Sequence, residues 1–519
     1  MPFRKDMDRR HFLGLSAFSV LLSGCGNDES STVAAQPDKL SPDVPVASVL
    51  AESDWQLLAD NLSGDIILPT HGQDYELARL VFNSRYDHIY PQVITQCHNN
   101  DDVAFVLSFA QQHNLAITPR CGSHSYAGTS TTEGMVIDVT PMANIDISGN
   151  TVTIGAGARL VDVYDTLEKS GLGIPLGSCL SVGISGLTQG GGFSILDRAY
   201  GLTCDSLTSI DVVTAQGEKL TCSESQNVDL FWALRGGGGG NFAVVTAFTF
   251  NAHNTSDIHV FEAYFSFADF EEVMAKWQEL PDYWPNAMWG QIIPNWSNGG
   301  APSVYVRAFC VNSKAEADSY WQQFIASLIA IPLSNNNTTD SYRNVMLGTC
   351  SNTIAACHLS TQFSDGGMRR SAFAASSDFF EQIVPPIGIT ALKTYISESV
   401  GQGNLGMIII NLMGGAIAEK SPDSTAFPHR NAIFNAQYYT AFTTSTSNMV
   451  VDSAQLWENS FREVMKPWSS GGAYINYQDA LIDNWQQAYY GDNYYKLTQI
   501  KGRYDPNSVF NQAQAVEPA

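Results

Sequence analysis

Basic residues are scarce in this sequence. It has 27 Lys and Arg against 51 Asp and Glu, which gives a formal net charge of −24 at pH 7. Proteins that bind nucleic acid neutralise phosphates with clustered Lys and Arg, so this balance argues against nucleic acid as a partner. The acidic surface that it implies favours solubility and does not identify a substrate.

Several common binding motifs are also absent. The glycine-rich stretch over residues 120–205 does not have the G-x-G-x-x-G pattern, and no Walker A sequence occurs, so NAD and ATP have no candidate site there. No C-x-x-C or H-E-x-x-H pattern occurs, so we predict no metal site. The 519 residues, with 44% hydrophobic content, are enough for more than one domain.

A long apolar run is missing near the start of the chain. The run from Leu13 to Leu22 is far shorter than the roughly 20 residues of a membrane-spanning helix. The preceding segment Arg9–Leu13, with two consecutive arginines, resembles a twin-arginine signal, which exports folded proteins. The segment Leu22–Cys25 resembles a lipoprotein processing box, in which the cysteine is lipidated. An ordinary signal peptide with a chance cysteine is the alternative.

These features predict a signal over residues 1–25 and a flexible tether over residues 26–60, which begins rich in Ser, Pro, Ala and Asp. Lipid on Cys25 would hold the protein on a membrane, because each buried CH₂ contributes about 0.8 kcal/mol. The predicted location is the bacterial cell envelope, on its periplasmic or extracellular side.

Glycine loops dominate the stretch from Arg120 to Asp205. The first loop is Arg120–Tyr126, and a second group comprises Gly177–Cys179, Val182–Gly186 and Gly190–Gly192. Glycine reaches positive φ freely, so such loops can turn several backbone N–H groups toward one point. Converging N–H groups make a concave anion site suited to a pyrophosphate.

Apolar spacing predicts the elements around these loops. A helix is expected over Val103–His113 with a cap near Asn99, and a second over Leu160–Lys169 that ends at Gly171. Strands are expected over Tyr86–Ile94, Met135–Val139, Thr151–Ala156, Ser209–Val213 and Val244–Phe250, and over Met407–Met413 with both faces buried.

The glycine stretch resembles the berberine-bridge-enzyme-like branch of the vanillyl-alcohol-oxidase (PCMH-type) flavoproteins. That family has an R-x-G-x-H loop and a later C-x-x-V/I/L-G-x-x-G…G-G-G loop. The similarity continues through four further segments: Tyr200–Asp205, Asp229–Gly238, Tyr474–Asp479 and Lys501–Pro506. It covers roughly residues 60–515 and, in combination, the motifs are highly specific.

The resemblance implies an α+β fold in which the C-terminus returns to the first domain. A PCMH-type FAD-binding domain is expected over residues 61–255 and an antiparallel-sheet substrate domain over residues 256–465. Residues 466–519 would complete the FAD domain.

The resemblance also implies FAD with two covalent bonds, from His124 to the flavin 8α-methyl and from Cys179 to flavin C6. The pyrophosphate cradle would comprise Arg120, Cys121, Gly122, Ser123, His124, Ser125 and Tyr126. The ring and ribityl chain would meet Val182, Gly183, Gly186, Gly190, Gly191 and Gly192, with Gly201 and Asp205 beyond them.

The sequence has nine cysteines, which limits the number of disulfides that can form. Lipidation of Cys25 and flavin attachment at Cys179 would leave seven, an odd number, so at least one is expected to be unpaired. We expect Cys121 to pack as a small apolar residue. Two pairings are open: Cys350 with Cys357, and Cys204 with Cys222.

Two tyrosines are candidates for the base that removes a substrate hydroxyl proton, Tyr474 and Tyr477, because the family's Y-x-N-Y-x-D segment reaches the flavin. Asn476 would contact the flavin. A free tyrosine has a pKa of about 10, so a neighbour must lower it. The candidate neighbours are His429, Arg430 and Gln437, and the alternative is that both tyrosines only pack.

The predicted activity is oxidation of a small-molecule alcohol or hemiacetal, with O₂ as acceptor and H₂O₂ as product. Val182, at the family position near flavin C4a, favours oxygen access over a dehydrogenase that uses a quinone or protein acceptor. A saccharide is the favoured substrate, and phenolic or polyketide-like molecules are the second choice. The tryptophans that could stack a sugar, or belong to the core, are Trp284, Trp289 and Trp296. A catalytically dead binding lipoprotein is the rival from another class.

Overall fold

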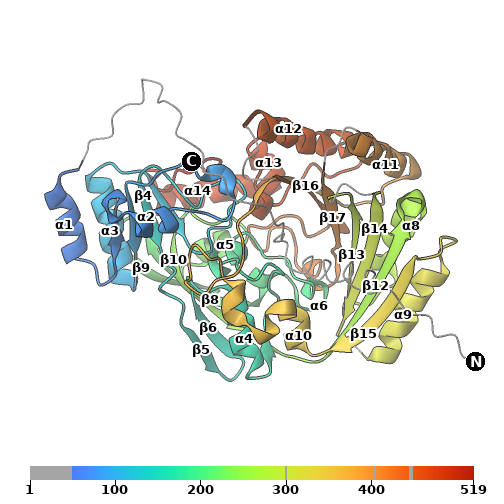
Figure 1. Ribbon diagram of the computed structural model, residues 1–519. Coiled ribbons are helices and arrows are strands. Elements are labelled where there is room, and N and C mark those ends of the chain that lie inside the picture. The colour runs from blue at the N-terminus through green and yellow to red at the C-terminus, as the bar shows by residue number, and fades with distance from the viewer. Residues whose placement is uncertain (1–49, 298–300, 312, 402–404, 443–447) are drawn as a thin grey trace, which may run out of the picture.

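The computed structural model describes residues 50–519 except 298–300, 312, 402–404 and 443–447 (Figure 1). The predicted signal and most of the predicted tether lie outside the described residues. Helix α1 (Glu52–Asp60) lies within the range predicted as tether, and its Leu58 is fully buried. Residues 52–60 are therefore helical, where a flexible tether was predicted.

The first unit is built on two sheets. One has the order β1-β2-β4-β3, and its three longer strands are parallel. The other is antiparallel with the order β5-β6-β10-β8-β9. Their strands are β1 (Ile66–Ile67), β2 (Val93–Gln96), β3 (Ile117–Arg120), β4 (Met135–Asp138), β5 (Ile145–Ser148), β6 (Thr151–Gly155), β8 (Leu207–Thr214), β9 (Lys219–Ser223) and β10 (Ala243–Asn251). A two-stranded sheet pairs β7 (Leu172–Gly173) with β11 (His253–Asn254).

Both predicted helices of this unit are confirmed. In α3 (Asn100–Gln112) the Asn99 side chain accepts hydrogen bonds from two backbone N–H groups of the first turn, which a helix cannot satisfy internally. Helix α4 (Leu160–Glu168) is followed by Gly171 at a φ of +67°. The other helices here are α2 (Gln73–Ala78), α5 (Ile184–Gln189), α6 (Asp197–Tyr200) and α7 (Val228–Ala233).

The strand predicted over Tyr86–Ile94 is wrong at its start, because β2 begins only at Val93. Pro91 has no N–H for a sheet ladder, and its carbonyl accepts a 2.7 Å hydrogen bond from the Tyr75 hydroxyl instead. The segment before β2 is therefore a loop that is held by this side-chain hydrogen bond.

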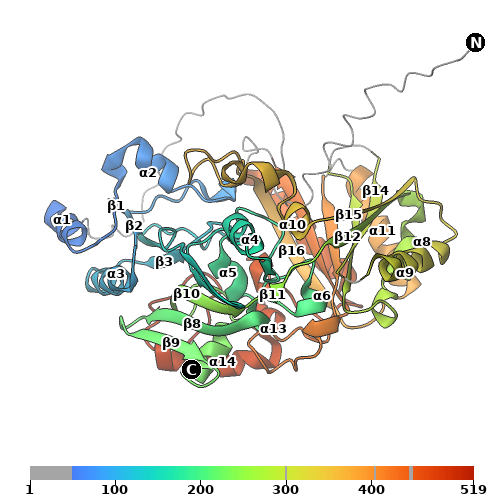
Figure 2. The ribbon, with the colours of Figure 1, turned by 90° about the horizontal axis from the view of Figure 1, so that it is seen from below.

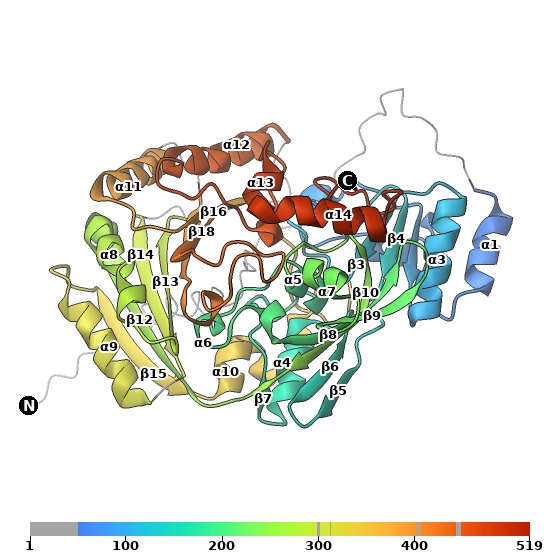
Figure 3. The same cartoon turned by 180° about the vertical axis from the view of Figure 1, so that it is seen from behind.

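The second unit is one antiparallel sheet of seven strands in the order β15-β12-β14-β13-β17-β18-β16. Figures 1 and 3 show helices on its side away from the first unit. They are α8 (Phe270–Trp277), α9 (Lys314–Ala326), α11 (Pro386–Gly401) and α12 (Asn448–Met465). The strands are β12 (Ile258–Ser266), β13 (Met288–Asn295), β14 (Ser303–Cys310), β15 (Ser334–Asp340), β16 (Ala372–Phe380), β17 (Met407–Leu412) and β18 (Phe434–Phe442).

Period-two alternation divides this sheet into two faces. Phe261, Ala263 and Phe265 of β12 belong to the core under the helices, whereas the intervening Glu262 and Tyr264 point to the opposite face. Two faces with different chemistry thus follow directly from the strand sequences.

The chain crosses between the units more than once. Helix α10 (Tyr342–Leu347) packs on α4, and its Tyr342 and Leu347 belong to the core of the first unit although they fall within the range predicted for the substrate domain (Figure 2). The buried Arg198 side chain of α6 donates hydrogen bonds to carbonyls of the second unit, at Met288, Trp284 and Met413. These links fix the two units against each other.

The C-terminal residues complete the first unit, as predicted. Helices α13 (Trp485–Tyr490) and α14 (Tyr494–Tyr504) lie against it (Figure 3). The fully buried Lys501 ammonium donates 2.6 Å hydrogen bonds to Asp505 and to the carbonyls of Asn241 and Phe510. The α+β fold with a returning C-terminus is confirmed.

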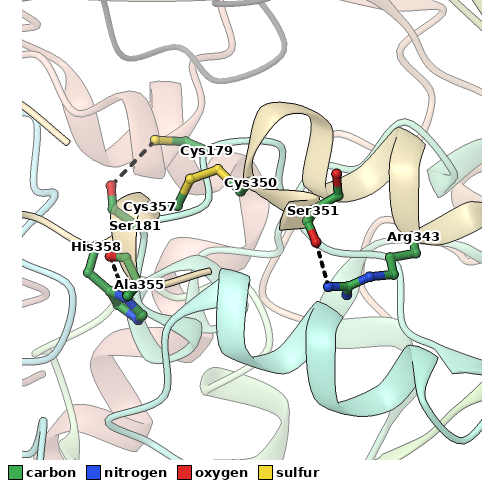
Figure 4. Close-up of a disulfide and its surroundings, with 8 residues drawn as sticks. All are labelled: Cys179, Ser181, Arg343, Cys350, Ser351, Ala355, Cys357 and His358. Carbon is green, nitrogen blue, oxygen red and sulfur yellow. Dashed lines mark hydrogen bonds between the residues drawn. A yellow bond between two sulfur atoms is a disulfide. The ribbon is translucent and has the colours of Figure 1, made fainter. Parts of the chain in front are cut away.

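Cys350 and Cys357 form a disulfide, which confirms one of the two pairings left open (Figure 4). Cys204 and Cys222 are both buried but not bonded. Cys222 pairs with Ile210 across the β8–β9 ladder, whereas Cys204 precedes β8, so the two are offset along the strand.

Candidate active site

A cavity of about 480 Å³ lies between the units. The first unit contributes both glycine loops, and the C-terminal segment contributes residues 474–478. The second unit contributes the sheet face away from its helices. The sheet residues that line the cavity are Trp289, Gln291, Ile293, Arg307, Phe373, Met407, Ile409, Asn411, Gln437, Tyr439 and Ala441.

The two predicted attachment residues converge on one hydroxyl group. His124 Nε2 lies 2.9 Å from Ser181 Oγ. Cys179 Sγ lies 4.0 Å from the same oxygen (Figure 4). The imidazole stacks on Phe82, with ring centroids 4.1 Å apart. Burial, reinforced by the charge of Arg159, lowers the pKa of His124 to about 3, so the ring is neutral at physiological pH.

The histidine loop offers backbone donors to an anion. Ser123 has a φ of +60°, a left-handed conformation that is uncommon for a residue with a Cβ. The N–H groups of Gly122, Ser123 and His124 donate no hydrogen bond to another residue in the described part of the chain. All three residues line the cavity. Successive N–H groups around a left-handed residue form an anion-binding nest, so this loop fits a pyrophosphate.

Two glycines bring the loops together. A Cβ on Gly122 would lie 2.1 Å from the Gly183 nitrogen, and a Cβ on Gly183 would lie 2.1 Å from Cys121 Sγ. The loops therefore touch backbone to backbone, which only glycine permits. At Gly186, which lines the cavity, a Cβ would meet nothing within 4 Å, so a flat ring can approach there.

Five predicted cofactor residues do not line the cavity: Gly190, Gly191, Gly192, Gly201 and Asp205. The N–H groups of the glycine run are already used, for example by a 2.9 Å hydrogen bond from Gly192 to Tyr474 Oη. Asp205 instead receives two hydrogen bonds from Arg430, at 2.7 and 2.9 Å. These residues pack the loops rather than contact the cavity, which corrects the prediction.

The remaining residues of the first loop support it internally. Arg120 pairs with Asp138 at 2.6 Å and donates to the Ala78 carbonyl, so its charge is neutralised away from any phosphate. Cys121 is buried as predicted, and burial raises the pKa of its thiol. The Ser125 hydroxyl lies 2.7 Å from that of Thr129.

Tyr474 is the better placed of the two candidate bases. Its Oη accepts hydrogen bonds from Gly192 N and Asn476 Nδ2, both at 2.9 Å. Such donors favour a phenolate, but burial outweighs them and raises the pKa of Tyr474. The Tyr477 ring stacks on Tyr126 with centroids 5.3 Å apart, and burial raises its pKa as well.

Of the predicted neighbours of these tyrosines, only Gln437 lines the cavity, where its Nε2 donates to the Tyr126 hydroxyl at 2.9 Å. His429 stacks on Phe379 outside the lining, and Arg430 is held by Asp205. No cation therefore lowers the pKa of either tyrosine within the described residues.

Of the three tryptophans predicted either to stack a sugar or to belong to the core, one lines the cavity. Trp289 lines the cavity, whereas Trp284 and Trp296 are buried in the core behind the sheet. Similarly, the predicted strand at Met407–Met413 exists, but Met407 and Ile409 are only half-buried, because they face the cavity.

Sequence reasoning missed the polar residues of the cavity. Arg307 stands alone among the apolar residues of β14, and Gln291 and Asn411 interrupt β13 and β17 in the same way. Asp197 is almost fully buried in the lining, which raises its pKa to about 8. A lone polar residue in an apolar strand was the available signal.

Comparison with known families identifies the class. A model described as FAD binding domain matches residues 91–223, and a model described as berberine and berberine like matches residues 473–517. The first match covers both glycine loops, and the second covers the tyrosine segment. Together with the fold, they define an FAD-linked oxidoreductase with a PCMH-type FAD-binding domain.

Individual relatives make the family explicit. The FAD-linked oxidoreductase YgaK of Bacillus subtilis is 31% identical over 452 residues, covering 86% of this chain and 95% of that protein. The structure of Physcomitrella patens BBE-like 1 has a TM-score of 0.81 at 25% identity, covering 90% of this chain and 99% of its own. Chitooligosaccharide oxidase shares the fold, with a TM-score of 0.79 at 22% identity over 90% of this chain and 100% of its own. The chain belongs to the berberine-bridge-enzyme-like family of FAD-linked oxidoreductases.

Proposed function

We propose that this protein oxidises an alcohol or hemiacetal group of a saccharide, using FAD bound covalently through His124 and Cys179. The observation that carries the proposal is the convergence of these two side chains at one hydroxyl, facing a sheet lined with polar residues. Bound FAD would supply a two-electron acceptor for the hydride lost from the substrate C–H bond.

In this proposal Tyr474 holds the proton that the substrate hydroxyl loses. The hydroxyl O–H breaks as the C–H hydride departs, so the alcohol becomes a carbonyl and Tyr474 Oη gains the proton. The donors Gly192 N and Asn476 Nδ2 stabilise negative charge on that oxygen before the transfer.

The saccharide class is supported by the lining and by one structural neighbour. Gln291, Arg307, Asn411 and Gln437 offer amide and guanidinium groups that suit hydroxyl-rich ligands. The neighbour that shares the fold is named chitooligosaccharide oxidase. A phenolic or polyketide-like alcohol is the second candidate, favoured by the aromatic part of the lining at Phe193 and Trp289.

We propose O₂ as the final electron acceptor, which takes up two electrons and two protons to give H₂O₂. Val182 supports this, because it lines the cavity with a short side chain beside Gly183. A dehydrogenase with a quinone or protein acceptor is the alternative.

The proposal places the protein on the periplasmic or extracellular side of the bacterial cell envelope, held by lipid on Cys25 after twin-arginine export. Both signals lie outside the described residues. Among the residues that are described, no helix has the length and apolar content to cross a membrane. Labelling with a radioactive fatty acid, with Cys25→Ala as the control, tests the anchor.

The experiment for the activity is a panel of saccharides and phenolic alcohols with the purified full-length protein. We expect anaerobic bleaching of the flavin absorbance by a saccharide, and equal oxygen consumption and H₂O₂ formation in air. Bleaching without oxygen consumption would support the dehydrogenase. A protein that never carries flavin would instead support a binding lipoprotein and end the redox proposal.

A further inference from the structure

A row of polar side chains runs across the cavity face of the seven-stranded sheet. Arg307 on β14 is paired in register with Gln291 on β13, which is paired with Asn411 on β17. Directly paired residues of neighbouring strands project from the same face. Arg307 Nε donates to Gln291 Oε1 at 2.7 Å, and Gln291 Nε2 donates to Asn411 Oδ1 at 2.5 Å. These bonds orient each member of the row.

Arg307 ends the row. Arg307 is 4% exposed, and its Nε donates to Gln291, while the Tyr305 hydroxyl and the charge of Glu262 also act on the guanidinium. Glu262, its register partner on β12, accepts a hydrogen bond from the Tyr305 hydroxyl. Arg307 also lines the cavity, so its guanidinium is open to a ligand there.

A buried cation is costly, because burial removes its hydration, and the charge of Glu262 and the hydroxyl of Tyr305 offset that loss only in part. Burial accordingly lowers the pKa of Arg307. The edge of a guanidinium presents two parallel N–H groups that match the two oxygens of a carboxylate. A carboxylate-bearing ligand would therefore balance the charge that the folded chain offsets only in part.

Building on the saccharide oxidation proposed above, we propose that Arg307 binds a carboxylate of the substrate, so that the preferred substrate is an acidic saccharide carrying a uronic-acid group. Gln291 fixes the guanidinium through its Nε and leaves the opposite edge for the ligand. Arg307 is then a specificity-determining residue, and the reacting hydroxyl lies elsewhere on the same sugar.

The charges of the cavity agree with an anionic ligand. Asp197 is the acidic residue among those that line it, and burial keeps its pKa near 8, so it is largely neutral at physiological pH. The other cation of the lining, Arg120, is neutralised by Asp138. The strong negative charge of the surface is screened beyond about 8 Å at physiological ionic strength.

The test compares two ligands that differ in charge alone. Full-length protein with its flavin is titrated with D-glucuronate and with neutral D-glucuronamide, following heat and the flavin absorbance spectrum. We expect the wild type to bind glucuronate at least tenfold more tightly, and Arg307→Gln to bind the two equally. Arg503→Gln removes the same charge from an exposed ion pair with Asp229 and should keep the tenfold preference.

Equal binding of both ligands by the wild type would overturn the proposal without any variant. A preference for glucuronate that survives in Arg307→Gln would overturn it too. If the flavin reduction potential also shifts in that variant, the guanidinium acts on the cofactor and not on the substrate. Flavin bleaching by neutral sugars is scored separately. Its absence would count against saccharide oxidation, while the titration still decides the role of Arg307.

Discussion

Gln362 Nε2 donates a 2.7 Å hydrogen bond to Ser123 Oγ, which ties the segment after the disulfide to the histidine loop. Oε1 of the same amide accepts a 2.8 Å hydrogen bond from Arg159. Gln362 thus spans a residue in a left-handed conformation and the cation beside His124. The segment that crosses from the second unit therefore braces the loop whose N–H groups we expect to bind the cofactor.

Replacing Gln362 with Leu should loosen this brace. We expect the free energy of unfolding to fall by about 2 kcal/mol, because Ser123 and Arg159 each lose a partner while buried. The flavin content per chain should fall as well. Denaturant unfolding and the ratio of flavin to protein absorbance measure both effects. Gln323→Leu on exposed α9 is the matched control, and equal flavin content in all three proteins would contradict the role of the brace.

The attachment residues predict a distinctive pattern of flavin loss. After acid precipitation, wild type, His124→Ala and Cys179→Ala should all retain flavin in the pellet, because either bond suffices. The double variant should release it. Mass spectrometry of flavin-bearing peptides identifies the bonds, with Cys222→Ala as the control thiol. Complete release from the wild type would rule out covalent attachment.

Tyr474 predicts a steep pH dependence of flavin reduction. Burial raises its pKa, so the phenolate is a minor species throughout the neutral range and its fraction grows about tenfold per pH unit. The rate of anaerobic flavin reduction should rise in parallel up to about pH 9. Tyr474→Phe should lower that rate by roughly 10²- to 10⁴-fold and flatten the profile. Tyr477→Phe should keep the slope, and a slope that persists in Tyr474→Phe would assign the base elsewhere.

The Cys350–Cys357 disulfide closes a short loop that packs on the first unit. Replacing both cysteines with Ser should lower the free energy of unfolding by about 2.5 kcal/mol, from the chain entropy that the short loop restricts. Thermal unfolding with and without reductant measures this. Reductant should lower the melting temperature of the wild type and leave the variant unchanged.

His429 predicts a contribution to acid sensitivity. The ring stacks on Phe379 at 4.0 Å, and burial lowers its pKa to about 3 from an ordinary value of 6.5. Between these values the unfolded chain binds a proton that the folded chain does not, so stability is lost as pH falls below 6.5. The slope is about 1.4 kcal/mol per pH unit. Urea unfolding at pH 4.5, 5.5 and 6.5 should show a slope smaller by this amount in His429→Gln, and equal slopes would refute a buried neutral ring.

Motif spacing predicted the cavity-lining residues that lie within short, contiguous loops. The loop Arg120–Tyr126 and the residues Cys179, Val182, Gly183 and Gly186 all line the cavity, because each loop is a short segment of fixed geometry. The glycine run that follows does not, since its N–H groups are claimed by residues far along the sequence such as Tyr474. Such partners are set by tertiary packing and leave no trace in a local pattern.

The row of polar residues on the cavity face of the sheet could not be predicted from the sequence, for a different reason. Alternation along β14 separates Arg307 from its apolar neighbours, but it does not say which face meets the cavity. That choice depends on four helices covering the other face, and their packing involves residues spread over most of the second unit. The same limitation applies to Cys204 and Cys222, whose offset follows from the β8–β9 register.

The buried Lys501 ammonium donates a hydrogen bond to the carbonyl of Asn241, just before β10, the central strand of the five-stranded sheet. During synthesis that strand leaves the ribosome long before Lys501 does. The unit that cradles the cofactor therefore lacks an internal cation partner until translation is nearly finished. We therefore expect the flavin to be loaded late in synthesis, and a chain truncated before residue 501 to lack a finished cofactor domain.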